Sequence, residues 1–278
     1  MQSFYICLCL FFSLTEAAYC HGKPDPLAQP NLHPIDTKAP VFVREVENAS
    51  LYTVGTGEDS FSVVHLWSND AYTRGYAQGS LMKDDVSSFV TQAYTYFEDT
   101  FEKALNGSVP WIPESMAHWV AELGLDAGLD YTYDITKSFT GDYFFQELQG
   151  LADGAGIDYI MVRRVHMIGE LTKGSCSMYG AWNTATEKGK TLQLRALDWN
   201  VDGPFQDYPQ VTVYHSNSPD SPNGQSFANV GWSGWIGSIS GMSSEQTAIS
   251  EIGVSYPDAS FGNESVHGVS THLTYLHI

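Results

Sequence analysis

Basic side chains are scarce in this sequence. Lys and Arg together number 13 among 278 residues, against 32 Asp and Glu, so the formal net charge is −19. Nucleic acids and anionic membranes are bound by clusters of Lys and Arg, and so few cations cannot form a continuous basic patch. The composition therefore argues against a nucleic-acid partner. It suits a protein that stays soluble in an acidic compartment.

Long hydrophobic runs are also missing. A membrane-spanning helix needs about 20 consecutive apolar residues, and the apolar run at residues 4–14 (FYICLCLFFSL) is too short. Small residues suited to signal peptidase follow it at 15–18 (TEAA). We therefore predict no integral membrane span and a cleaved signal peptide at residues 1–17, with a buried N-terminal strand as the alternative.

Passage through the secretory route has two consequences. The protein is predicted to be secreted or lysosomal. Three Asn-x-Ser sequences then become predicted glycosylation sites, at Asn48, Asn106 and Asn263.

Cysteine is rare as well. Of 4 Cys, Cys7 and Cys9 fall in the predicted signal peptide, which leaves Cys20 and Cys176. So few cysteines exclude a disulfide-rich scaffold, although a Cys20–Cys176 disulfide is a structural alternative for this pair. An unpaired thiol on an oxidising route is a liability unless the protein uses it. Cys176 is therefore the candidate functional residue.

The sequence changes in character along its length, and 43% hydrophobic residues allow a sizeable core. Residues 18–59 are predicted to be an extended leader, 60–175 a mostly helical part and 176–278 a β-rich part. Helices are predicted at 71–101, 113–123 and 144–155. Strands are predicted at 60–66, 178–182, 191–197, 210–215, 226–230, 236–239 and 247–252. The fold class is therefore predicted to be α+β, without internal repeats.

Familiar metal and serine-hydrolase patterns are absent. His166, His215 and His267 lack the spacing of metal ligands and are predicted to be structural or surface residues. Residues 231–234 (GWSG) do not fit the G-x-S-x-G frame of a serine nucleophile. We expect no metal and no cofactor.

The predicted boundary between the helical and β-rich parts falls at Cys176, in the stretch KGSCSMY (173–179). A nucleophile at the start of a strand indicates a chain that cleaves its own Ser175–Cys176 bond. Cleavage would release an α-amine, whose ordinary pKa of about 7.7–8.0 lies close to the value of about 8.5 for a thiol. That amine can act as the base for the sulfur of the same residue, so no separate His is required.

Four blocks of sequence, in order, resemble one family. They are 74–79 (RGYAQG), 147–156 (ELQGLADGAG), Cys176-Ser177 with 195–199 (RALDW), and 241–242 (GM) with 248–250 (AIS). Together they resemble the N-terminal-nucleophile (Ntn) cysteine hydrolases, the family of acid ceramidase, N-acylethanolamine-hydrolysing acid amidase and the acyl-CoA:isopenicillin N acyltransferases. The resemblance implies an αββα sandwich of two antiparallel sheets flanked by helices.

The resemblance also implies roles for particular residues. Cys176 would cleave the chain and then accept the acyl group, and Asp198 would orient the new α-amine. Arg195 would favour the thiolate and bind polar atoms beside the acyl carbonyl. Trp199 would line an acyl pocket and Glu251 would point at the site. The residues alone also allow a plain cross-strand ion pair of Arg195 with Asp198, a core role for Trp199 and a solvated Glu251.

The implied function is a self-processing cysteine amidase that hydrolyses linear amides, with a lipid acyl chain, through a thioester on Cys176. The alternatives are an N-acyltransferase that uses the same site and a catalytically inactive secreted glycoprotein on the same scaffold. The two cleavage fragments would remain together as a heterodimer.

Two departures from the family bear on activity. Cys-Ser-Met stands where the ceramidase branch has Cys-Thr-Ser. Members of the family also continue well beyond the length of this chain, with further strands and an Asn that serves the oxyanion hole. The resemblance therefore implies that the C-terminal part is missing from this form.

Overall fold

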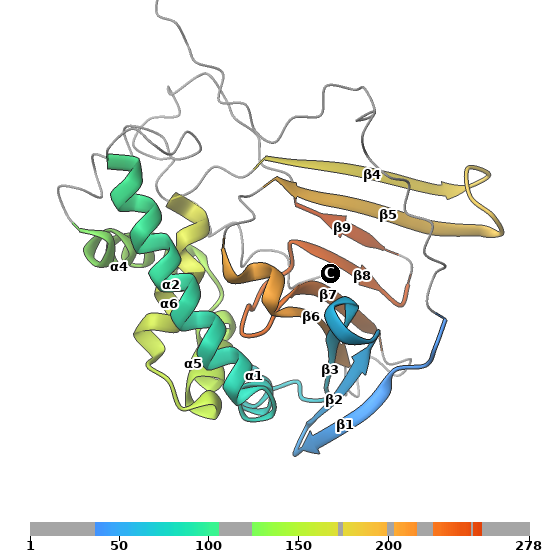
Figure 1. The fold of residues 1–278 in the computed structure, drawn as a ribbon, viewed down its shortest axis with the longest axis horizontal. Coiled ribbons are helices and arrows are strands. Elements are labelled where there is room, and N and C mark those ends of the chain that lie inside the picture. The colour runs from blue at the N-terminus through green and yellow to red at the C-terminus, as the bar shows by residue number, and fades with distance from the viewer. Residues whose placement is uncertain are drawn as a thin grey trace, which may run out of the picture.

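Helices and strands segregate along the chain into an α+β fold (Figure 1). The structure is a computed structural model, and it describes residues 37–105, 124–171, 175–198, 203–215, 225–245 and 247–251. Several predictions lie outside these ranges: the signal peptide, Cys20, the helix at 113–123, Trp199, His267, Asn106 and Asn263.

The largest element is a seven-stranded sheet with the order β1-β2-β3-β6-β7-β8-β9. Its strands are β1 (Val41–Val46), β2 (Ala49–Val54), β3 (Phe61–Leu66), β6 (Pro209–His215), β7 (Ser226–Trp232), β8 (Ser240–Ser243) and β9 (Ala248–Ser250). A separate hairpin consists of β4 (Ser175–Asn183) and β5 (Gly189–Asp198).

The large sheet is mixed, which corrects the expectation of antiparallel sheets. β3 and β6 pair in parallel, with Val63 opposite Val211, while the other described strand pairs are antiparallel. Parallel neighbours need a long crossover, and here the crossover contains the described α-helices and the β4–β5 hairpin. The β3–β6 pair is therefore the seam between the N-terminal strands and the later ones.

Two predictions made from the sequence are wrong in the region of this sheet. Part of the predicted leader, 18–59, forms the β1–β2 hairpin, whose turn contains Asn48 at a φ of 62°. The strand predicted at 236–239 does not form, because Ile236 is fully buried among helices and Gly237 has a φ of 117°. The next strand, β8, begins only at Ser240.

Helices fill the stretch between β3 and the hairpin. They are α1 (Ala71–Leu81), α2 (Lys83–Leu105), α4 (Leu125–Thr136), α5 (Asp142–Ala155) and α6 (Tyr159–Leu171). The helical predictions at 71–101 and 144–155 are confirmed by α1, α2 and α5. α4 and α6 were not predicted. For α6 the missed signal is Asp158, whose side chain accepts a hydrogen bond of 3.1 Å from the Ile160 N–H at the start of the helix.

α1 and α5 cross with their backbones almost in contact. A Cβ on Gly75 would lie 1.9 Å from the Glu147 carbonyl oxygen, and one on Gly150 would lie 2.0 Å from that of Tyr72. Gly79 and Gly154 repeat the pattern one turn further on, at 2.3 Å in each case. Only glycine permits such an approach. The glycines of the blocks 74–79 and 147–156 therefore have a packing role in this structure.

A buried ion pair joins the same two helices. Arg74 Nη2 lies 2.7 Å from Glu147 Oε2, and the Glu147 side chain has no exposed surface. Burial raises the pKa of the Glu147 carboxyl, while Arg74 and a hydrogen bond from Tyr214 oppose the shift. Arg74 and Glu147 are the first residues of the two blocks, so the blocks contact each other.

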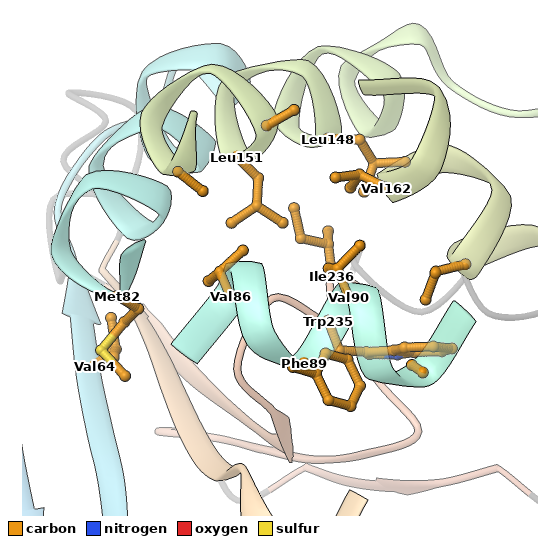
Figure 2. Close-up of a cluster of buried hydrophobic side chains, with 14 of the residues drawn as sticks. Val64, Met82, Val86, Phe89, Val90, Leu148, Leu151, Val162, Trp235 and Ile236 are labelled. Carbon is orange, nitrogen blue, oxygen red and sulfur yellow. The ribbon is translucent and has the colours of Figure 1, made fainter. Parts of the chain in front are cut away.

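The core lies between these helices and one face of the large sheet. Figure 2 shows Val86 and Val90 of α2 beneath Leu148 and Leu151 of α5, with Ile236 also in this cluster. Val64 and Leu66 of β3 belong to the same cluster and are fully buried. Helix and strand residues therefore share one core.

Candidate active site

The β4–β5 hairpin positions the candidate nucleophile. Cys176, near the start of β4, pairs with Leu197, and Arg195 pairs with Met178. In an antiparallel ladder, residues two positions apart along a strand share a face. Cys176 and Arg195 are therefore diagonal neighbours on the same face of the hairpin.

The thiol of Cys176 contacts the guanidinium of Arg195. Arg195 Nη2 donates to Cys176 Sγ at 3.1 Å, and Cys176 is 8% exposed. Cys176 carries a free thiol and is the one cysteine in the described part of the chain. A fixed cation beside a sulfur stabilises its thiolate form, which is the nucleophilic form. The geometry thus provides a semi-enclosed thiol with a charged donor on it.

Glu251 completes the contact group. Arg195 Nε donates to the Glu251 carbonyl oxygen at 2.9 Å, and Arg195 Nη2 lies 3.2 Å from Glu251 Oε2. The Arg195 side chain is 6% exposed and that of Glu251 18%. Of the residues predicted from the sequence, the structure therefore brings together Cys176, Arg195 and Glu251. The ion pair described for Arg195 is with Glu251.

The remaining predicted site residues are placed only in part. Asp198 is the last residue of β5, and its register partner is Ser175, the residue before the predicted cleavage point. The backbone of Asp198 therefore lies beside the Ser175–Cys176 bond. Trp199 lies outside the described residues.

Gln193 joins this group although the sequence analysis did not single it out. Its side-chain amide donates to the Ile249 carbonyl oxygen and to Ser250 Oγ. Gln193 and Arg195 are two residues apart on β5, and this alternation is the signal that would have found it.

His166 is a buried structural residue, as predicted. Its Nδ1 lies 2.7 Å from the Val162 carbonyl oxygen, and its Nε2 accepts a hydrogen bond of 2.9 Å from the Ile236 N–H. The carbonyl can only accept, so Nδ1 carries the proton and the ring is neutral. His166 thereby ties α6 to the segment that precedes β8.

His215 belongs to a second cluster, on the β3–β6 seam. His215 Nε2 lies 2.7 Å from His65 Nδ1, and His215 Nδ1 lies 3.0 Å from Ser226 Oγ. The indole of Trp67 is within 22° of parallel to both imidazoles. Burial lowers the pKa of both His65 and His215, and the proximity of His215 lowers that of His65 further.

In the described part of the chain, no group of three or more His, Cys, Asp or Glu side chains is arranged to hold a metal ion. Among the same residues, no helix is both long and apolar enough to cross a membrane.

Comparison with known proteins finds relatives in Dictyostelium discoideum. The chain is 36% identical to Protein dcd1B of Dictyostelium discoideum over 225 residues, which are 81% of this chain and 44% of that protein. It is 34% identical to Protein dcd1A of the same organism over 239 residues, which are 84% of this chain and 53% of that protein. The chain spans about half the length of these curated relatives. No family model matches the sequence.

Proposed function

We propose that this chain belongs to a self-processing cysteine amidase of the Ntn class, with Cys176 as the nucleophile. The observation that carries the proposal is the 3.1 Å contact between Arg195 Nη2 and Cys176 Sγ at the start of a hairpin. The resemblance of the four sequence blocks supports it. The large sheet, with helices packed on one face, and the β4–β5 hairpin would then be parts of an αββα sandwich.

Self-processing would use the thiol of Cys176 on the preceding carbonyl. The sulfur attacks the carbonyl carbon of Ser175, the C–N bond to Cys176 breaks, and the nitrogen takes up a proton to become an α-amine. Water then hydrolyses the Ser175–Cys176 thioester. The products are a Ser175 carboxylate and a chain that begins at Cys176. Asp198, whose backbone neighbours Ser175, would hold the new amine.

Turnover would follow the same chemistry on an external amide. The α-amine takes the thiol proton, and the sulfur attacks the amide carbonyl while Arg195 stabilises the developing charge. The leaving amine carries the proton away, and water hydrolyses the thioester to release the acid and restore the thiol. The proposed substrates are linear amides with a lipid acyl chain. Acyl transfer to an amine is the second route from the same thioester.

The proposed function is accompanied by three further predictions, about the fragments, the location and glycosylation. The two fragments would remain associated, because β3 of the first pairs with β6 of the second. The protein would reach the lysosome or the exterior by its signal peptide. Asn48, in the β1–β2 turn, would then carry a glycan.

Mass spectrometry of the expressed full chain tests the proposal. We expect a fragment that begins at Cys176, and we expect Cys176→Ala to give a single intact chain. An intact wild-type chain that still hydrolyses amides would refute the mechanism.

Product analysis with an added amine separates hydrolysis from transfer. A binding glycoprotein would be indifferent to the Cys176→Ala change and would show no second fragment.

A further inference from the structure

The site depends on how β9 is held against the hairpin. β5 and β9 are neighbours in space (Figure 1), but they belong to two different sheets. In the described residues no backbone ladder connects these sheets. Something other than main-chain pairing must set the position of β9 relative to β5.

Two side chains of β5 take the place of that ladder. Gln193 Nε2 donates to the Ile249 carbonyl oxygen, and Arg195 Nε donates to the Glu251 carbonyl oxygen at 2.9 Å. The donors are two residues apart on β5, and the acceptors are two residues apart along the second segment. A carbonyl oxygen can only accept, so the NH₂ end of the Gln193 amide must face Ile249. Its second N–H reaches Ser250 Oγ.

The β8–β9 ladder fixes the register of β9, and the Glu251 N–H continues it with a hydrogen bond of 2.9 Å to the Ile239 carbonyl oxygen. The position of the separate hairpin against β9 therefore decides whether Arg195 meets Glu251. In the observed position, Arg195 Nη2 is shared between Cys176 Sγ at 3.1 Å and Glu251 Oε2 at 3.2 Å. A shift of the hairpin along β9 would separate the Glu251 carboxylate from the guanidinium that contacts the thiol.

We propose that Gln193 is a positioning residue that holds the β4–β5 hairpin against β9, so that Arg195 stays on Glu251. The inference rests on the proposed function of Cys176, since it concerns the setting of that thiol. Gln193 does not touch the sulfur among its described contacts. It acts through β9 and Glu251.

Alkylation of Cys176 by iodoacetamide, measured against pH in the full chain, tests this role without requiring turnover. Gln193→Met keeps the volume and removes the donor, and Glu251→Gln removes the carboxylate. We expect both variants to be alkylated faster than wild type at low pH, by up to about tenfold, because a negative charge near the sulfur is withdrawn. The Gln193→Met/Glu251→Gln double variant should be alkylated no faster than Glu251→Gln alone, because both changes remove the same interaction.

Leu194→Met is the matched control, since Leu194 is on the same strand and 64% exposed. It should leave the dependence of the alkylation rate on pH unchanged.

A wild-type pH dependence in Gln193→Met, or additive effects in the double variant, would overturn the inference. If the alkylation effects couple as expected but the wild-type chain neither cleaves nor turns over amides, the positioning role stands and the amidase proposal fails. If wild type cleaves and turns over while the effects are uncoupled, only the positioning role fails.

Discussion

At the level of single residues, Arg195 shows how one side chain joins separate parts of the chain. Its guanidinium contacts the Cys176 thiol and both the carbonyl and the carboxylate of Glu251. A lysine has a single nitrogen in place of the separate Nε and Nη2 atoms that make these contacts, so it does not reproduce their geometry. The planar geometry of arginine is therefore what allows the thiol and the carboxylate to share one cation.

His166 offers a test of stability at the same scale. Replacing it with Phe keeps a ring against Trp235, at present 5.0 Å between centroids, but leaves the Ile236 N–H without its acceptor. We expect the free energy of unfolding to fall by about 1–3 kcal/mol, the cost of an unsatisfied buried donor. Urea unfolding measures it.

The control for His166→Phe is Ile160→Ala on the same helix, where the side chain is 43% exposed. That change should alter stability by much less. A His166→Phe variant as stable as wild type would show that the bond to Ile236 contributes little.

At the level of elements, the crossing of α1 and α5 is the tightest feature of the helical part. Glycines of one helix face main-chain oxygens of the other, and the Arg74–Glu147 ion pair lies at the same crossing. Motifs that resemble those of a catalytic family thus have a clear mechanical role. They let two helices approach closely.

Gly150→Ala tests this crossing. The new Cβ would lie 2.0 Å from the Tyr72 carbonyl oxygen, so the helices must move apart and the core must repack. We expect a loss of about 1–3 kcal/mol or more, the usual range for overpacking, measured by thermal or urea unfolding.

Gly180→Ala is the matched control for this glycine, because its Cβ would meet only the Trp182 ring, at 3.7 Å. It should be tolerated. Equal losses in the two variants would mean that the glycine effect is not specific to the helix crossing.

At the level of the whole molecule, the parallel β3–β6 pair joins the segments before and after the candidate cleavage point. The His65–His215 contact, with a distance of 2.7 Å between ring nitrogens, sits on this seam. Neither ring has a carboxylate among its described hydrogen-bond or ion-pair partners. The fold therefore stabilises a neutral, proton-sharing pair here.

The lowered pKa values of His65 and His215 predict the pH dependence of this seam. The unfolded chain binds protons near pH 6.5, whereas the folded rings bind them only at lower pH. The stabilisation is therefore complete above about pH 6.5 and is lost as the pH falls from there towards the folded pKa values. The free energy of unfolding should decline more steeply between pH 7 and 5 in wild type than in His65→Gln/His215→Gln.

Urea unfolding of both proteins at several pH values measures this difference. Contributions from the carboxyl groups are common to the two and cancel in the comparison. Parallel curves for the two proteins would contradict the prediction.

The α+β class and the helices α1, α2 and α5 could be predicted from the sequence alone, because they follow from local periodicity, which needs no knowledge of distant contacts. Cys176 stood out as the one cysteine beyond the first twenty residues, whereas Arg195 was predicted from the resemblance of the sequence blocks. The β1–β2 hairpin was missed, because its residues were predicted to be part of an extended leader. The strand predicted at 236–239 does not form, because the apolar residues there are buried outside the sheet ladder.

The remaining features could be known only from the folded chain. The parallel seam between β3 and β6, the contact between the blocks at α1 and α5, and the meeting of Gln193, Arg195 and Glu251 all join residues far apart in sequence. Such contacts arise because folding buries apolar faces and aligns strand edges across the whole chain. The order of residues along one segment carries no record of which distant segment will lie against it.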